Sequence, residues 1–191
     1  MSTVSIIGTG AMGSAIADVA RRGGAEVELV GRDHAGSALS GDVVVLAVPH
    51  AALPELVRAY GDQLAGKVVV DITNPVDFET FDGLTVPAGS SAAAELAQQL
   101  PHARVVKAFN TTFAGTLAAG TVGPLTTTVL VAGDDADAKA TVARLVEAGG
   151  LKAVDAGSLR RAREMEALGF LQITLAAAER IGWTGGFGVA A

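Results

Sequence analysis

The segment from Thr3 to Gly24 constrains the fold of this chain more than any other part of the sequence. Its β-branched run Val4–Ile7 leads directly into the glycine-rich turn GTGAMG (residues 8–13), and an alanine-rich stretch with apolar residues at helical spacing follows. A strand, a tight glycine turn and a helix in this order are the context that the dinucleotide-binding fingerprint GxGxxG requires. We therefore predict that this segment is the first strand–turn–helix unit of a nucleotide-binding sheet.

Each glycine of the turn has a separate physical role. Gly8 allows the chain to turn sharply, Gly10 has no Cβ and lets the backbone approach a pyrophosphate, and Gly13 lets the helix pack closely on the strand. The free N–H groups at the positive end of the helix then face the anion. The cofactor-binding residues predicted in this turn are Gly8, Thr9, Gly10, Ala11, Met12 and Gly13.

Strand-like and helix-like segments alternate along residues 1–157. Several strand-like runs are continuous Val, Ile and Leu, which is typical of strands buried on both faces of a parallel sheet. The alternation predicts an α/β fold with a Rossmann-like, doubly wound and mainly parallel sheet. The expected strands are Val4–Ile7, Glu26–Val30, Val43–Val48, Val68–Ile72, Arg104–Phe109, Thr127–Ala132 and Lys152–Asp155, and the expected helices are Ala11–Arg22, Leu53–Tyr60, Ser91–Gln99 and Ala136–Ala148.

The last third of the sequence has a different character. Residues 158–180 carry apolar side chains on one helical stripe and are expected to form one long helix, which a glycine-rich tail follows. We predict two units, a nucleotide-binding Rossmann domain at residues 1–157 and a small C-terminal helical lobe at residues 158–191. The lobe is expected to serve the acceptor site or a dimer contact.

Composition and charge exclude several other classes of protein. The 191 residues include no cysteine, which removes disulfides and thiol chemistry, and nothing pairs the three histidines as a metal site. The formal net charge of −6 argues against nucleic acid as the main partner. The chain enters a strand at its N-terminus, and no apolar run reaches the ~18 residues needed to span a bilayer. We expect a cytoplasmic protein without a metal, a membrane or a nucleic-acid partner.

The end of the second strand bears on the choice of dinucleotide. Glu26–Val30 is followed by Gly31, Arg32 and Asp33. NAD sites usually place an acidic residue here for the ribose 2′-hydroxyl, whereas an arginine matches the 2′-phosphate of NADP. Asp33 is a candidate for the acidic role, but it lies two residues past Gly31 and fits better as the cap of the next turn. We predict NADP, bound at Gly31 and Arg32.

The connection after this strand is unusually short. Only residues 33–41 separate it from the next apolar run, and a parallel crossover needs about a dozen residues or more. We therefore predict that the outer strand beside the second strand is missing or rudimentary. That edge of the sheet helps to wall the adenine, so the adenine half of the site is expected to be open.

Three further strand ends carry candidate site residues, because ligands of a doubly wound sheet bind beyond the carboxyl ends of its strands. Backbone at Val48 and Pro49 is expected to flank the nicotinamide ribose, and Asn74 and Pro75 follow the next strand. After the strand beyond it, Asn110 provides an amide that suits a carboxamide or a ring edge.

Several side chains near these ends have two interpretations each. His50 is either a general base or a histidine at a helix entry or on the surface, and the second is favoured because no carboxylate partner is visible. Lys107 is either a catalytic base or an exposed charge on a strand edge, and the exposed charge is favoured. Phe78 and Phe81 form either a platform for a flat ligand or a satellite core under a loop.

Motifs for acid–base or nucleophilic catalysis are missing from the sequence. It contains no Ser-His-Asp set, no paired carboxylates and no Tyr-x-x-x-Lys relay. Hydride transfer directly between two cofactor rings depends on positioning more than on acid–base catalysis. The absence of such motifs therefore fits a reaction that passes a hydride directly between two cofactor rings.

Several motifs of the sequence match one family when they are taken in order. They are IIGTGAMG, GRD, VVVLAVP, VVVDITNPVDF, SAAAELAQQLPHARVVKAFNT, VAGDD and VDAGSLRRAREME, and together they cover most of residues 1–170. The chain resembles the NADPH-dependent coenzyme F-420 reductases. The resemblance implies a Rossmann domain with a small C-terminal lobe, usually dimeric. It also implies reversible hydride transfer between the nicotinamide of NADPH and the deazaflavin ring of coenzyme F-420.

The resemblance also implies roles for single residues. Asn110 falls where some members carry a histidine beside the two rings. The phosphate and glutamyl tail of coenzyme F-420 need cations, for which Arg160, Arg161 and Arg163 are candidates. The resemblance assigns Thr9, Gly10, Ala11 and Met12 to the pyrophosphate, Gly31 and Arg32 to the 2′-phosphate, and Val48, Asn74 and Ala114 to the nicotinamide half.

Two other functions are open alternatives. One is an NADPH-dependent reductase of another acceptor, such as an imine, a flavin or a ferric chelate. The other is a non-catalytic NADP-binding or sensor module, which the missing sheet edge favours.

Overall fold

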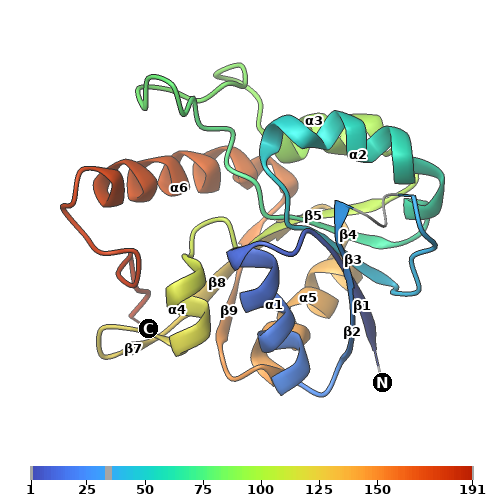
Figure 1. Cartoon of the computed structure of the whole chain (residues 1–191), viewed down its shortest axis with the longest axis horizontal. Coiled ribbons are helices and arrows are strands. Elements are labelled where there is room, and N and C mark those ends of the chain that lie inside the picture. Colours follow the sequence, from blue (N-terminus) through green and yellow to red (C-terminus); the bar gives the residue numbers. More distant parts are fainter. Residues whose placement is uncertain (1, 33–35, 191) are drawn as a thin grey trace.

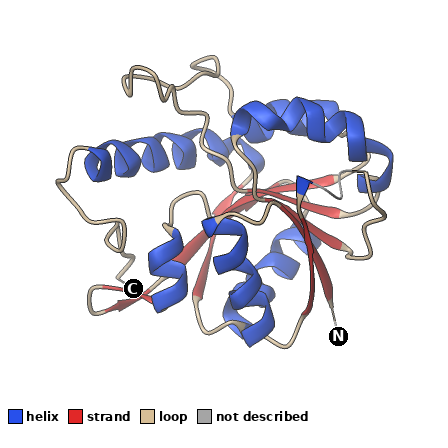
Figure 2. Cartoon of the chain, viewed as in Figure 1, coloured by secondary structure: helices blue, strands red, loops and turns tan. Residues whose placement is uncertain are grey.

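Apolar runs of the sequence form a seven-stranded sheet, and helices cover both of its faces (Figure 1, Figure 2). The computed structural model describes residues 2–32 and 36–190. Within them the strand order is β2-β1-β3-β4-β5-β8-β9, and all neighbours are parallel except β5 and β8. The predicted Rossmann-like, mainly parallel fold is confirmed. The strands are β1 (Thr3–Ile7), β2 (Glu26–Val30), β3 (Val43–Leu46), β4 (Val68–Asp71), β5 (Arg104–Ala108), β8 (Thr128–Gly133) and β9 (Lys152–Gly157).

The two covered faces explain why the strand sequences are continuously apolar. In β3, Val43 and Val45 pack in the core under α1 and α5, whereas Val44 and Leu46 pack in the core under α2 and α3. Every residue of such a strand is buried, so polar alternation has no place in it. The helices on one face are α1 (Ala11–Arg22), α4 (Ala114–Ala119) and α5 (Ala136–Ala148); those on the other are α2 (Leu53–Tyr60) and α3 (Ala92–Gln99), with the 3₁₀ turns η2 (His50–Ala52) and η3 (Gly61–Leu64).

Strand β2 forms one edge of the sheet. Within the described part of the chain no strand pairs with its outer side, and residues 36–41 contain no strand. The predicted loss of the outer strand is therefore confirmed. Asp33, the expected turn cap, lies outside the described residues.

Glu28 on β2 ties this short connection to the sheet. Its Oε2 accepts hydrogen bonds from the Ser5 hydroxyl at 2.6 Å and from the Ser40 amide and hydroxyl at 3.1 and 3.0 Å. The Ser5 hydroxyl in turn accepts a hydrogen bond from the Gly41 N–H at 2.9 Å. These bonds, above all the one from Ser5, hold the pKa of Glu28 below its ordinary value. The connection is therefore organised around an ionised carboxylate.

We expect Glu28→Gln to lower the free energy of unfolding by about 1 kcal/mol at neutral pH. Because the folded-state pKa of Glu28 is depressed, its carboxylate stabilises the fold above the unfolded-state pKa, and this contribution is lost as the pH falls through the folded-state pKa. The difference from wild type should therefore shrink below about pH 4.5. Urea unfolding at several pH values measures it, with Glu26→Gln, an exposed carboxylate of the same strand, as the control. Equal stability of Glu28→Gln and wild type at neutral pH would contradict the expectation.

The C-terminal helix is shorter than the predicted helix over residues 158–180. A 3₁₀ turn, η4 (Leu159–Arg161), precedes α6 (Ala162–Ala177). Glu179 adopts a φ of 57°, a left-handed conformation found at helix ends, and the Arg180 N–H bonds to the Leu175 carbonyl at 2.8 Å. The prediction is wrong here because no glycine marks this end in the sequence. Neither α6 nor any other helix of the described residues has the length and apolar character needed to cross a membrane.

Residues 110–127 contain structure that the sequence pattern does not predict. After α4, a hairpin of β6 (Thr121–Val122) and β7 (Leu125–Thr126) leads the chain into β8. This compact connection brings β8 in antiparallel to β5. The C-terminal tail returns to the same hairpin, where a Cβ on Gly188 would lie 2.7 Å from Leu125 Cδ1.

Candidate functional site

The glycine turn between β1 and α1 has the shape of an anion site. Gly8 adopts a φ of +118°, and a Cβ there would overlap the Ala47 carbonyl, while a Cβ on Gly13 would overlap the Gly8 carbonyl. A Cβ on Gly10, in contrast, would meet no atom within 4 Å. The fold itself therefore requires glycine at positions 8 and 13 and leaves the space beside Gly10 free.

The start of α1 offers backbone N–H groups to an anion. Thr9, Gly10 and Ala11 are exposed, Gly10 caps the helix without a side-chain hydrogen bond, and the first turn contains no acidic residue. The first N–H groups of a helix have no partners within it, and the helix dipole makes this end positive. The residues present therefore fit the pyrophosphate of a dinucleotide.

The end of β2 lies beside this turn. The Gly8 N–H donates to the Val30 carbonyl at 2.9 Å, and a Cβ on Gly31 would lie 3.7 Å from the Thr9 methyl group. Arg32, the next residue, is exposed. A guanidinium next to the pyrophosphate turn and on the open edge of the sheet is placed for a second phosphate.

Two asparagines join the carboxyl ends of β4 and β5. Asn110 donates from Nδ2 to Asn74 Oδ1 at 2.9 Å and to the Met165 carbonyl at 2.9 Å, and Asn74 donates from Nδ2 to the Asn110 carbonyl at 2.8 Å. Asn110 is 4% exposed, and its Oδ1 has no hydrogen-bond partner among the described residues. A buried amide oxygen without a donor is rare and fits a site that receives an N–H group from a ligand.

The other predicted strand-end residues lie along the same edge, because β1, β3, β4 and β5 are parallel. Val48 is half-buried after β3, Pro75 is buried after β4, and Ala114 is half-buried at the start of α4. Pro49 is exposed and precedes η2. The edge therefore presents mostly backbone and small side chains.

His50 lies apart from the asparagine pair. It begins η2 and lines a pocket of about 130 Å³ between α2 and α3, together with Glu95 and Gln99. Neither Asn74 nor Asn110 lines this pocket. The structure therefore does not group His50 with the amides at the carboxyl ends of β4 and β5.

Lys107 is not the exposed edge charge that the sequence analysis favours. Its side chain is fully buried, and Nζ donates to Asp71 Oδ2 at 2.9 Å, to Glu166 Oε1 at 2.7 Å and to the Thr73 carbonyl. An ammonium has three donors, and all three are used here. The Lys107 side chain is therefore directed at protein acceptors and not at the open edge of the sheet.

No local sequence pattern links Lys107 to its partners, because they are distant in the chain. Asp71 is 36 residues away and Glu166 is 59 residues away. One available signal was the position of Lys107 inside the apolar run VVKAF, since a central strand of a doubly wound sheet is buried on both faces. A lysine there requires buried acceptors.

The arginines considered for the acceptor are surface residues. Arg161 lies 3.6 Å and Arg163 lies 2.7 Å from Glu164, whose pKa is lowered chiefly by the hydrogen bond from Arg163. Arg160 is exposed. Glu164 therefore offsets part of the positive charge at the start of α6.

The two phenylalanines of the long loop after β4 are also on the surface. Phe78 is 60% and Phe81 is 40% exposed, and their rings meet edge to face with centroids 5.6 Å apart. The interpretation as a satellite core is therefore wrong, and the interpretation as a platform for a flat ligand stays a prediction.

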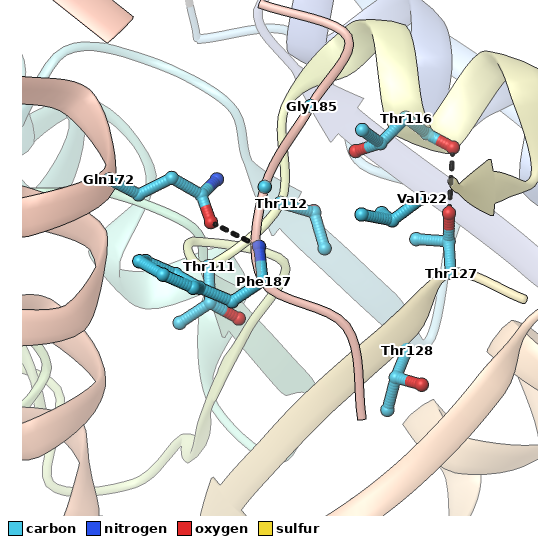
Figure 3. A pocket seen from close by; sticks show the side chains of 10 residues that line it. Thr111, Thr112, Thr116, Val122, Thr127, Thr128, Gln172, Gly185 and Phe187 are labelled. Atoms are coloured by element: carbon cyan, nitrogen blue, oxygen red, sulfur yellow. Dashed lines mark hydrogen bonds between the residues drawn. The ribbon is translucent and has the colours of Figure 1, made fainter. Parts of the chain in front are cut away.

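The C-terminal tail closes a small pocket that the sequence does not predict (Figure 3). The Phe187 N–H donates to Gln172 Oε1 at 3.3 Å, and Trp183 packs on Phe113 with ring centroids 5.0 Å apart. The tail thus runs beside α4 rather than away from the sheet (Figure 1). Five threonines also line the pocket, namely Thr111, Thr112, Thr116, Thr127 and Thr128.

The glycine turn, the exposed arginine after β2 and the paired amides at the carboxyl edge fit a Rossmann-type, dinucleotide-dependent oxidoreductase. The family model for NADP oxidoreductases dependent on coenzyme F-420 matches residues 24–75. The F-420-dependent NADP reductase of Methanocaldococcus jannaschii is 30% identical over 162 residues, which are 83% of this chain and 72% of that protein. The chain belongs to the family of F-420-dependent NADP reductases.

Two further similarities agree with this fold. A protein of Arthrobacter sp. FB24, whose crystal structure is described as an F-420-dependent NADP reductase, matches with a TM-score of 0.85 and 27% identity over 100% of both chains. The metalloreductase STEAP3 of Rattus norvegicus is 42% identical over 107 residues, or 56% of this chain. The chain spans 21% of the length of that metalloreductase.

Proposed function

We propose that the protein transfers a hydride reversibly between NADPH and the deazaflavin coenzyme F-420. The observation that carries this proposal is the glycine turn with free space at Gly10, placed beside the exposed Arg32. Membership of the F-420-dependent reductase family supports coenzyme F-420 as the second substrate.

In this proposal the dinucleotide lies along the carboxyl edge of the sheet. Residues 8–13 bind the pyrophosphate, and Arg32 beside Gly31 binds the 2′-phosphate through charge-assisted hydrogen bonds. The buried Oδ1 of Asn110 accepts an N–H group of the nicotinamide carboxamide or of the acceptor ring. Residues 1–157 form the NADP-binding unit, and residues 158–191 border the acceptor. The nicotinamide half borders Val48, Pro49, Asn74, Pro75 and Ala114.

For this reaction the protein has to position the two reacting partners and does not have to transfer a proton between them. Bound NADPH supplies a hydride to the deazaflavin ring, and one proton from water completes the reduced coenzyme. The chain's residues bind the two partners, orient them and exclude water. Lys107 is saturated by its acceptors and serves as a fixed charge under the site.

We also propose that the protein acts in the cytoplasm as a homodimer and has no nucleic-acid partner. Apolar side chains on α6 and the tail support a contact between two copies. Leu171 is 49% and Trp183 is 56% exposed.

Arg32→Ala is expected to weaken NADPH binding by about 1.5–3 kcal/mol, because hydrogen bonds to a charged phosphate are lost. NADH lacks the 2′-phosphate, so its affinity should barely change. Titration of nicotinamide fluorescence measures both affinities, with Arg21→Ala, an exposed arginine on α1, as the matched control. Equal losses for NADPH and NADH would remove the assignment of Arg32 to the 2′-phosphate.

The choice of acceptor is tested by parallel incubations with NADPH. Oxidised coenzyme F-420 should lose its absorbance, while FMN, ferric citrate and a cyclic imine should react far more slowly. Similarity to a metalloreductase supports a ferric chelate as the second candidate. Rapid ferric reduction with unchanged coenzyme F-420 would favour that candidate. Tight NADPH binding without any turnover would favour a sensor.

A further inference from the structure

A buried carboxylate links helix α6 to the sheet. Glu166 is fully buried and accepts hydrogen bonds from Lys107 Nζ at 2.7 Å and from the N–H groups of Ala92 and Ala93 at 2.9 and 3.3 Å. These are the first two N–H groups of α3, where the helix dipole also favours a negative charge. The same carboxylate therefore joins α6, α3 and the end of β5.

The backbone of α6 on either side of Glu166 touches the asparagine pair. The Met165 carbonyl accepts the Asn110 amide at 2.9 Å. One turn further on, a Cβ on Gly169 would overlap Asn74 Oδ1 and would lie 2.9 Å from the Asn110 carbonyl. A change in the register of α6 would therefore move both asparagines.

We propose that Glu166 is a positioning residue for hydride transfer, which sets α6 against the Asn74–Asn110 pair and thereby fixes the separation of the two rings. The inference rests on the proposed function, because it places the rings at the carboxyl ends of β4 and β5. Glu166 acts through Asn74, Asn110 and Met165 and does not touch the reacting atoms.

The chemistry of the cluster around Glu166 and Lys107 indicates that it fixes the position of α6 on the sheet. A buried ion pair bears a desolvation cost that a well-packed apolar pair avoids, so stability alone does not select it. Ionic and hydrogen-bonded partners are directional, and they stabilise one arrangement of the helix over its neighbours. Hydride transfer is sensitive to displacements of about 1 Å, which can change the rate by about 100-fold. A contact that fixes the position of α6 beside the reacting rings therefore affects the rate of hydride transfer.

The test compares Glu166→Gln with Glu147→Gln, a variant of an exposed glutamate on α5, away from the proposed acceptor side. In Glu166→Gln we expect the kcat for reduction of coenzyme F-420 to fall by about tenfold to 100-fold, with the Kd for NADPH within about twofold of wild type. Glu147→Gln should match wild type in both. A role in stability alone would lower the melting temperature and leave kcat unchanged at a temperature where each variant is folded, and this result would overturn the proposal.

Gly169→Ala supplies an independent variant, because it pushes α6 off the asparagine pair without removing a charge. We expect the same split between kcat and NADPH affinity. Unchanged kcat in both Gly169→Ala and Glu166→Gln would exclude a positioning role for this contact.

Hydrogen exchange gives a readout that does not depend on turnover. In wild type, NADPH should slow exchange in residues 8–13 and in residues 108–114, whereas in Glu166→Gln it should slow only the first segment. If wild type fails to reduce coenzyme F-420, the proposed function fails while this comparison still decides the positioning role. Equal protection of residues 108–114 in both proteins would contradict it.

Discussion

The variant Lys107→Met is expected to lose about 3–5 kcal/mol of unfolding free energy at neutral pH. Removal of the ammonium leaves Asp71 and Glu166 without their shared cation, although both carboxylates are fully buried. An uncompensated buried charge is one of the few causes of so large an effect. Methionine keeps the length and the apolar stem of the side chain, so the loss reports the charge rather than a cavity. Urea unfolding, followed by circular dichroism, measures it.

Lys139→Met is the matched control for this experiment. Lys139 also pairs with an aspartate, but Asp155 is 62% exposed in its side chain. Surface ion pairs contribute about 0–1 kcal/mol, so this variant should remain close to wild type. If the two variants were equally stable, the cluster around Lys107 would not be the buried charge network described above.

The second large effect is expected at Gly10. Gly10→Val should weaken NADPH binding by about 3 kcal/mol or more, or about 100-fold, because at least two N–H bonds to the pyrophosphate are blocked. The fold should persist, since a Cβ here meets no protein atom within 4 Å and the backbone has an ordinary extended conformation. The cost to stability should stay near 1 kcal/mol, the value of a poorer helix cap. Calorimetric titration and thermal unfolding of the same sample separate the two effects.

Gly13→Ala reverses this pattern. Its Cβ would overlap the Gly8 carbonyl, so we expect a loss of stability before any specific loss of binding. NADPH affinity retained in a folded Gly10→Val variant would contradict the assignment of the turn to the pyrophosphate.

The sequence predicts most of the sheet because local signals and tertiary packing agree there. The run Val4–Ile7 and the glycines after it match the dinucleotide-binding pattern, which can be recognised within one strand–turn–helix segment. The structure requires glycine at position 13 because of the Gly8 carbonyl in the same segment, and at position 8 because of the Ala47 carbonyl after β3. The missing outer strand follows from the length of residues 33–41. In both places the sequence signal is local, so it can be recognised without knowledge of distant partners.

Structure that depends on distant partners could not be predicted in the same way. The burial of Lys107 could not be predicted because its acceptors belong to β4 and α6. A single sequence does not show which segments contact each other. The hairpin after α4 lacks apolar periodicity, because its strands have two residues each and are only half-buried. The asparagine pair was found as two separate strand ends, and only the structure shows that the amides bind each other and the backbone of α6.

The most direct test of the proposed function follows the hydride itself. The protein is mixed with NADPH that carries deuterium at nicotinamide C4 and with oxidised coenzyme F-420, and the reduced coenzyme is isolated for mass spectrometry. A deazaflavin holds the transferred hydrogen on carbon, so the label is not lost to water. When both C4 hydrogens of NADPH are deuterium, we expect one carbon-bound deuterium in the reduced coenzyme. When NADPH is unlabelled and the water is deuterated, we expect none on carbon after the N–D group formed with the solvent has exchanged back in ordinary water. Absence of reduction, or reduction with hydrogen drawn from water, would contradict direct hydride transfer between the two rings.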